Sequence, residues 1–224
     1  MRLMASETEV RAQLVRQIVS LFPLSDAERE AIDDAWTATL GRLEERFIRI
    51  KNKYYSRDGE VIFDPLHGCQ WAHFLYTLSN EIHHRGGGVR SVCDKIYALN
   101  RALSSADLYY EVELPDIFTF DHPLGAVMGR AEYADYFTFS QGCTVGNNNG
   151  VYPRFGKRVF MMSDSKVVGG CRIGDNVIIG ANACIKDQDV PSNSIVFGES
   201  PNLVIKENRK AAVDSHANGV FFYD

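Results

Sequence analysis

The chain has 224 residues, of which 45% are hydrophobic, 24% charged and 11% aromatic. This length and composition fit one full domain with a smaller second one, and they exclude a mainly disordered, collagen-like or coiled-coil chain. The net charge is −5, without a long lysine and arginine block, so we expect no nucleic-acid partner. No apolar run reaches the roughly 18 residues of a membrane span, and the N-terminus lacks the apolar stretch of a secretory signal. We therefore expect a cytoplasmic protein without a membrane partner.

Apolar side chains recur at spacings of three and four through the first hundred residues, which is the period of an amphipathic helix. The first such series is Val10, Leu14, Ile18 and Leu21. Ser25 followed by Glu28 fits a capping box, in which each residue satisfies a free backbone amide of the other. This pattern predicts a helix over about 26–50.

Two further helices are expected before residue 108. Asp64 and Pro65 are typical of a helix start, because proline is tolerated in the first turn, and the glycines at 86–88 should end this helix. A last helix carries the apolar series Val92, Ile96, Leu99 and Leu103. The first part of the chain should therefore be an α-helical domain.

After residue 110 the apolar period changes to six. The apolar residues at this spacing are Phe155, Met161, Val167, Ile173, Ile179 and Ile185. Glycine follows three of them, and the residues four positions further on are small or β-branched in five of six cases. A six-residue unit fits one short strand and a tight corner, so three units close a triangular coil with every sixth side chain pointing inward. The repeat predicts a parallel β-helix, of which residues 155–190 supply two coils.

The cysteines and histidines do not suggest a metal site. Five cysteines lie at wide spacings without a Cys-x-x-Cys pair, which favours reduced, mostly buried thiols. A zinc site of three histidines on a β-helix is not expected, because His122 is the one histidine of the repeat region. We therefore expect no metal.

Three phrases accompany the repeat: DPLHGCQWAHFLY at 64–76, FDHPLGAVMG at 120–129 and VPSNSIVFGESP at 190–201. With the hexapeptide register they resemble the left-handed β-helix acyltransferases, and in particular the serine O-acetyltransferase family. The resemblance implies a homotrimer, or a hexamer of two trimers, with the active site between subunits.

The resemblance also implies the fold class and the division of the chain. The expected class is α+β, an N-terminal α-helical domain followed by a left-handed parallel β-helix of hexapeptide repeats. The expected ranges are 1–108 for the helical domain, 109–201 for the β-helix and 202–224 for a C-terminal tail.

By this resemblance His122 is the catalytic histidine. A neutral imidazole can take the proton of a hydroxyl as that hydroxyl attacks an acetyl thioester, and can then protonate the departing thiolate. A carboxylate should orient the imidazole. Glu113 occupies the place of the family's aspartate, although the segment that leads to the histidine is about one hexapeptide shorter here, and Asp116 and Asp121 remain alternatives.

The acceptor site keeps some of the family's residues and lacks others. The aspartates that contact the acceptor in the family correspond to Asp64 and Asp121. The family's Arg-His-Pro step, whose arginine grips the serine carboxylate, is Val-Tyr-Pro at 151–153 here. Arg154 is the candidate replacement cation, and Tyr152 would suit a sugar hydroxyl or ring.

The cosubstrate implied by the resemblance is acetyl-CoA, lying in a groove between neighbouring subunits. Ser163 and Ala181 match family positions on the groove wall, where small side chains let the pantetheine arm approach the backbone. Gly146 and Asn147 open a loop that can aim backbone amides at the oxygen that becomes negative during the transfer.

The sequence therefore predicts an acetyl-CoA-dependent O-acetyltransferase acting on serine or a similar small molecule. The alternative is the same chemistry on a sugar, nucleotide-sugar or polysaccharide hydroxyl, which the absent Arg-His step favours. A hypothesis of another class is a non-catalytic trimeric β-helix scaffold. That scaffold should have lost His122 or its flanking carboxylates, and these are present.

Overall fold

The computed structural model describes residues 1–86, 89–209 and 219–222. Within these residues the contacts separate two compact units. The first comprises Met1–Ile48 and Asn52–Glu111, and the second Arg49–Lys51 and Val112–Asp224.

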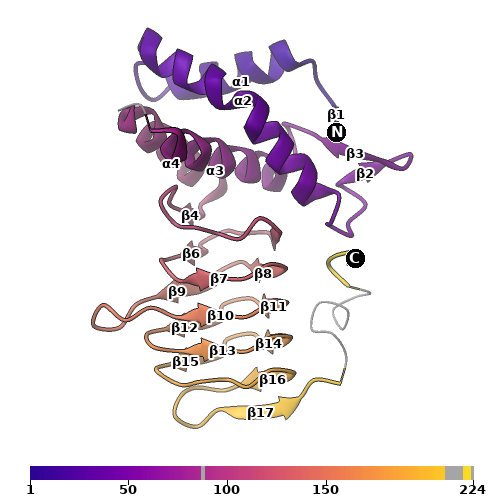
Figure 1. The fold of residues 1–224 in the computed structure, drawn as a ribbon, viewed down its shortest axis with the longest axis vertical. Helices are drawn as coiled ribbons and strands as arrows, with labels where there is room; N and C mark the ends of the chain where they lie inside the picture. Colours follow the sequence, from indigo (N-terminus) through magenta and orange to yellow (C-terminus); the bar gives the residue numbers. More distant parts are fainter. Residues whose placement is uncertain (87–88, 210–218, 223–224) are drawn as a thin grey trace. The chain divides into compact units, whose positions relative to one another are not determined.

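The described part of the first unit combines helices with a small sheet (Figure 1). Its helices are α1 (Glu7–Val19), α2 (Asp26–Phe47), α3 (Gly68–Arg85) and α4 (Arg90–Ser104). Its strands are β1 (Arg2–Leu3), β2 (Ser56–Arg57), β3 (Glu60–Phe63) and β4 (Asp107–Leu108), of which the first three pair in the order β1-β3-β2. No helix in the described part of the chain is long and apolar enough to cross a bilayer.

The capping box predicted for the long helix is confirmed. Ser25 Oγ accepts a hydrogen bond from the Glu28 backbone N–H, and the Ser25 backbone N–H donates to Glu28 Oε2 at 2.8 Å. The helix that follows is α2, and most side chains of the predicted apolar series are buried. Leu21 and Leu103 are exceptions, because Leu21 lies beyond the end of α1 and Leu103 lies in the last turn of α4.

The expected helix start at Asp64 is wrong, because α3 begins at Gly68 with His67 as its N-cap. Asp64 Oδ1 accepts a hydrogen bond from the Leu66 N–H at 2.9 Å, and the Asp64 N–H donates to Gln70 Oε1 at 2.7 Å. These bonds form a turn ahead of the helix, since a short acidic side chain competes for the local backbone amides. The sequence predicted that the glycines at 86–88 end this helix. Gly86 is the C-cap of α3, and residues 87–88 lie outside the described residues.

The second unit is a parallel β-solenoid whose coils stack as rungs (Figure 1). Its first strands are β5 (Phe118–Asp121), β6 (Val127–Met128), β7 (Glu132–Tyr133), β8 (Phe137–Ser140), β9 (Thr144–Gly146) and β10 (Arg154–Phe155). The strands that follow are β11 (Val159–Met161), β12 (Lys166–Val168), β13 (Arg172–Ile173), β14 (Val177–Ile179), β15 (Cys184–Lys186), β16 (Ser194–Phe197) and β17 (Val204–Glu207).

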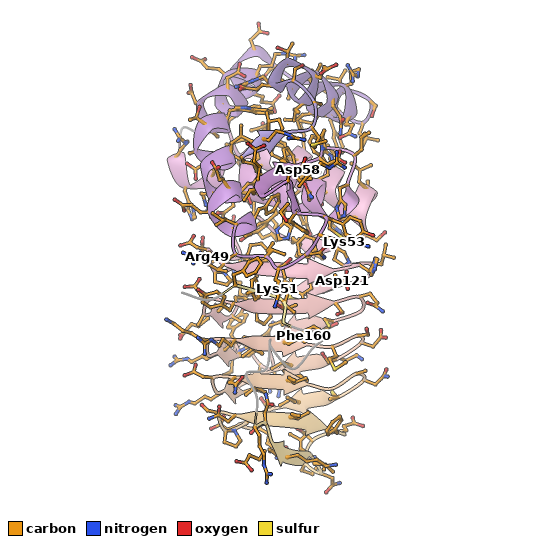
Figure 2. All side chains as sticks on the ribbon, turned by 90° about the vertical axis from the view of Figure 1, so that its right-hand side faces the viewer. Arg49, Lys51, Lys53, Asp58, Asp121 and Phe160 are labelled. Carbon is orange, nitrogen blue, oxygen red and sulfur yellow. The ribbon has the colours of Figure 1, made fainter. Side chains whose placement is uncertain are left out.

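These strands form the three sides of the solenoid. Their orders are β5-β8-β11-β14-β16-β17, β6-β9-β12-β15 and β7-β10-β13. Within the described residues the strands of these sheets pair in parallel, except that β17 runs antiparallel to β16. Figure 2 looks onto the first of these sheets, with Phe160 on a middle rung and Asp121 on an upper one.

The six-residue register is confirmed by burial. Every residue of the predicted apolar series, from Phe155 to Ile185, is at most 5% exposed. Five of the six residues in the second column are also buried, and only Asp189 is exposed. The inward-facing side chains therefore build an aliphatic core along the solenoid, as expected for a left-handed β-helix of hexapeptide repeats, and the coils extend on both sides of residues 155–190.

The described end of the chain pairs with residues 49–51 of the same unit. The Lys51 N–H donates to the Val220 carbonyl at 2.8 Å, and the Phe222 N–H donates to the Arg49 carbonyl at 2.7 Å. Phe221 is buried, with its ring 5.4 Å from that of Tyr136. Residues 210–218 and 223–224 of the expected tail lie outside the described residues.

Candidate active site

His122 lies at the corner between β5 and β6. Its φ is +48°, in the left-handed region, and its side chain is 77% exposed. The strand register gives this corner residues 122–126, whereas the corresponding corner of the next coil has only 141–143. A tight turn closes the longer corner, because the Leu124 N–H donates to the His122 carbonyl at 2.7 Å. The extended corner therefore presents the imidazole to solvent.

Asp121 is the carboxylate that the structure places beside this imidazole. Asp121 Oδ1 lies 3.6 Å from His122 Nε2, which is an electrostatic contact rather than a hydrogen bond. The two other candidates, Glu113 and Asp116, are exposed in the segment that leads into β5. The contact favours Asp121 as the orienting carboxylate.

Small side chains continue the His122 corner along the solenoid. The Asp164 N–H donates to the Gln141 carbonyl at 2.9 Å, and the Asn182 N–H donates to the Ser163 carbonyl at 3.0 Å. These bonds stack the corners that hold Gln141, Ser163 and Ala181 on successive coils. Two of the expected cofactor-binding residues, Ser163 and Ala181, thus lie on the same edge of the solenoid as His122.

Gly146 and Asn147 lie at a different corner, the one between β9 and β10. The loop there is a tight hairpin, because the backbones of Asn148 and Val151 exchange two hydrogen bonds of 3.0 Å. Asn149 and Gly150 at its tip both have positive φ, as a type I′ turn requires. The hairpin uses the N–H groups of Asn148 and Val151, and Asn147 Oδ1 accepts from that of Gly150. These three amides are committed to the turn and do not point to an oxyanion.

Asp187, from a later coil, holds this hairpin. Its carboxylate accepts hydrogen bonds from the Gly170 N–H at 2.9 Å and from Asn148 Nδ2 at 2.5 Å, and both lower the pKa of the Asp187 carboxyl. Gly169 has φ +84°, and a Cβ there would overlap Asp187 Oδ1. The hairpin is therefore fixed to two successive coils by one carboxylate and a glycine that leaves room for it.

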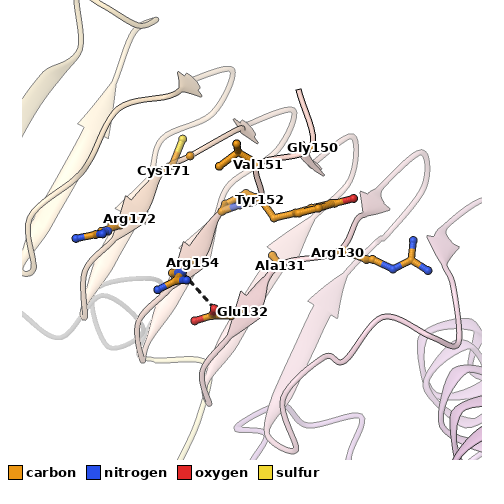
Figure 3. A pocket seen from close by; sticks show the side chains of 11 residues that line it. Arg130, Ala131, Glu132, Gly150, Val151, Tyr152, Arg154, Cys171 and Arg172 are labelled. Carbon is orange, nitrogen blue, oxygen red and sulfur yellow. Dashed lines mark ion pairs between the residues drawn. The ribbon is translucent and has the colours of Figure 1, made fainter. Parts of the chain in front are cut away.

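A pocket of about 580 Å³ lies beside the hairpin (Figure 3). It is lined by Arg130, Ala131, Glu132, Gly150, Val151, Tyr152, Pro153, Arg154, Gly170, Cys171 and Arg172. Tyr152 is 42% exposed, and Arg154 Nε forms an ion pair with Glu132 Oε1 at 3.1 Å. The structure therefore brings the two expected acceptor residues of this loop, Tyr152 and Arg154, into one pocket.

Four residues of this corner were missed by the sequence analysis: Arg130, Glu132, Arg172 and Asp187. Arg154 and Arg172 are three hexapeptides apart, so the repeat itself contained a signal for their alignment. Glu132 faces Arg154 only because the loop at 147–153 interrupts the register, and spacing does not reveal that.

A single chain does not bring the two corners together. His122 precedes β6, whereas Tyr152 follows β9, so the two residues lie at opposite ends of the strands of the β6-β9-β12-β15 sheet. Asp64, the remaining acceptor candidate, belongs to the first unit, where its side chain caps a turn.

Comparisons with known proteins point to one family, although no family model matches the chain. The serine acetyltransferase of Mycobacterium tuberculosis is 31% identical over 156 residues, which are 67% of this chain and 65% of that protein. That of Helicobacter pylori is 27% identical over 137 residues, 59% of this chain and 78% of that protein. This chain is therefore similar in sequence to serine acetyltransferases.

Solved structures agree on the fold of this acetyltransferase-like chain. A serine acetyltransferase in complex with cysteine matches 96% of the chain and 84% of its own length, with a TM-score of 0.70 and 17% identity. The enzyme of Vibrio cholerae O1 biovar El Tor matches 91% of the chain and 80% of its own, with a TM-score of 0.69 and 17% identity. Together with the curated relatives, this supports an enzyme of the acyltransferase class rather than a scaffold.

Proposed function

We propose that the chain transfers the acetyl group of acetyl-CoA to the hydroxyl of L-serine, forming O-acetylserine and free CoA. The curated relatives are named for this type of activity. The observation that carries the proposal is the His122 corner, where an exposed imidazole lies 3.6 Å from a carboxylate on an edge lined by small residues. These are a general base, its orienting group and a surface that a long thiol arm can follow.

In the proposed reaction His122 moves the proton. The hydroxyl oxygen of serine attacks the thioester carbonyl carbon, and the imidazole takes the hydroxyl proton. The carbon–sulfur bond then breaks, and the imidazolium returns the proton to the CoA thiolate. The carboxylate of Asp121 stabilises the imidazolium while it carries that proton.

The acetyl-CoA arm is proposed to lie along the edge that begins at His122. Ala181 is exposed and Ser163 half-buried on this edge, so neither carries a side chain long enough to block the backbone. A pantetheine arm can then lie close against the backbone of these corners.

The complete site is proposed to form between subunits of a homotrimer. His122 and the pocket beside Tyr152 lie at different corners of one chain, so one acceptor can meet both only if two chains contribute. A closed ring of like subunits supplies such a pair of corners at every interface. A hexamer of two trimers preserves the same sites.

A second acceptor class is a sugar or nucleotide-sugar hydroxyl, favoured by the loop residues. Val151 and Tyr152 stand where the family has arginine and histidine, and both side chains are exposed to the pocket. An aromatic ring with a hydroxyl suits the face and hydroxyls of a sugar better than the carboxylate of a free amino acid.

The test is the release of free thiol from acetyl-CoA by the purified protein, with L-serine and with a panel of sugars and nucleotide sugars. The first proposal predicts rapid release with L-serine and formation of O-acetylserine, detected by mass. Release with a sugar alone would replace serine by the second acceptor class. If protein that is shown to bind acetyl-CoA releases no thiol with any acceptor, both proposed acceptor classes are contradicted.

A further inference from the structure

The pocket beside the hairpin contains a ladder of charged residues on its outer wall. Strands β7, β10 and β13 are parallel, and their registers place Glu132 opposite Arg154 and Arg154 opposite Arg172. Neighbouring strands are about 4.8 Å apart, so these three side chains leave the sheet side by side. Arg130 adds a third guanidinium to the lining of the same pocket.

The charges on this ladder are unbalanced. Glu132 pairs with Arg154 at 3.1 Å, but in the described part of the chain Arg172 forms no ion pair through its guanidinium. The nearest carboxylate in the column, Asp189, accepts a hydrogen bond from the Arg172 backbone N–H at 2.8 Å. Like charges directly opposite on adjacent strands repel, so Arg154 and Arg172 favour an anion between them.

The pocket also has an apolar side. Val151 and Tyr152 project from the hairpin into the space above the ladder (Figure 3), and the hairpin is held in place by Asp187. The volume of about 580 Å³ falls in the range of small-molecule sites and is larger than a free serine needs. The two sides together select a ligand with an anionic end and a ring or carbon skeleton.

We infer that Arg172 and Arg154 bind an oxyanion of the acceptor, a carboxylate or a phosphate, while Tyr152 contacts its carbon skeleton. Glu132 holds the Arg154 guanidinium in a fixed orientation and leaves Arg172 as the unneutralised partner of the anion. The inference deepens the proposed function, because it names what the acceptor carries besides its hydroxyl. It assigns Arg172, three hexapeptides after Arg154, as a specificity-determining residue.

The experiment measures ligand binding without turnover, by calorimetry on the full chain. The probes are two matched pairs, L-serine with serinol and glucose 6-phosphate with glucose, so that each ligand with an oxyanion is compared with an analogue that lacks the carboxylate or phosphate. The variant is Arg172→Gln. Its control is Arg209→Gln, which likewise removes one exposed guanidinium, here one that lies 3.2 Å from Glu207 and outside the pocket.

We expect the Kd of at least one anionic probe to rise about tenfold in Arg172→Gln, as for a lost charge-assisted contact, and the analogues without the carboxylate or phosphate to show no such change. The probe that responds distinguishes carboxylate from phosphate. Arg209→Gln should leave all values unchanged. An unchanged Kd for both anionic probes overturns the inference. Coenzyme A is titrated in parallel, and a loss of affinity confined to it would assign the anion to the cosubstrate and also overturn the inference.

These results are separable from the proposed function. If Arg172→Gln weakens an anionic probe but no probe is acetylated by the wild type, the binding inference stands and the proposed reaction fails. If serine is acetylated by both proteins and neither anionic probe loses affinity in Arg172→Gln, the reaction stands and the inference fails.

Discussion

Two corners of the same solenoid differ in how many of the serine acetyltransferase family's site residues they contain. The His122 corner keeps the histidine, the adjacent Asp121 and the small residues Ser163 and Ala181 along its edge. The Tyr152 corner replaces the family's arginine and histidine by valine and tyrosine, and surrounds them with arginines from the neighbouring sheet. In the proposed function, the first corner supplies the groups for acetyl transfer and the second supplies the groups that bind the acceptor. On this proposal the chain shares its chemistry with the relatives and differs from them in how it binds the acceptor.

The largest effect is expected at the first corner. Replacing His122 by alanine should lower kcat by about 100-fold or more, because it removes the group that carries the proton. Acetyl-CoA binding, measured by calorimetry, should remain, since the edge of small residues is intact. His84→Ala, at an exposed histidine of α3, is the control and should retain full activity. Equal turnover in His122→Ala and wild type would contradict the role of this corner in proton transfer.

A larger side chain on the same edge should weaken the binding of acetyl-CoA and leave the binding of the acceptor unchanged. Ala181→Leu should raise the KM for acetyl-CoA about tenfold, because the added methylenes occupy the path of the pantetheine arm. The KM for the acceptor provides the internal control, since the second corner is untouched. A change confined to the acceptor KM would mean that the two corners have been assigned the wrong way round.

The glycines of the two corners give a matched pair. Gly169 at the hairpin and Gly125 beside His122 both have positive φ, but only at Gly169 would a Cβ overlap the Asp187 carboxylate. Gly125→Ala should therefore cost about 1 kcal/mol of unfolding free energy, and Gly169→Ala about 2 kcal/mol or more. Only Gly169→Ala should also raise the acceptor KM. Urea denaturation and steady-state kinetics measure both effects, and equal values for the two variants would show that the hairpin is not fixed by this contact.

The smallest effect is expected from Asp187. Asp187→Ala should raise the acceptor KM about fivefold with little change in kcat, because a hydrogen-bonded support of the hairpin is lost. The hydrogen bonds to Gly170 and Asn148 lower the pKa of this carboxyl below its usual 3.8, so the support is complete at neutral pH. It should weaken only as the pH falls through that lowered pKa. An acceptor KM that changes between pH 6 and 8 in the wild type but not in Asp187→Ala would contradict this.

The solenoid was predictable because its repeat is a local pattern. Every sixth residue from Phe155 to Ile185 faces inward, so one apolar column and its glycines were enough to recognise the coils. The strands β1 to β3 were not predictable from the sequence, because they have only two to four residues and β1 pairs with a segment far along the chain. The start of α3 was misplaced because Asp64 uses its side chain in a turn rather than as a cap.

The two halves of the candidate site also differed in how far the sequence predicted them. His122 and its neighbours are contiguous in the sequence, and a short phrase reveals them. The arginine ladder is not contiguous, because the facing of Glu132 and Arg154 depends on the length of the intervening hairpin. The Asp187 support joins coils that are distant in sequence, and only the three-dimensional register shows it.

The central claim is that the His122 corner of one chain and the Tyr152 corner of another form one site, and mixed oligomers test it most directly. One parent is His122→Ala, and the other is the double variant Val151→Glu, Tyr152→Glu, which places two carboxylates on exposed positions of the pocket. Both parents should be inactive, and oligomers assembled from equal amounts of the two should regain about a quarter of wild-type activity, because random assembly pairs the two intact corners at that frequency. Full activity in the double variant, or mixed oligomers as inactive as their parents, would contradict the account.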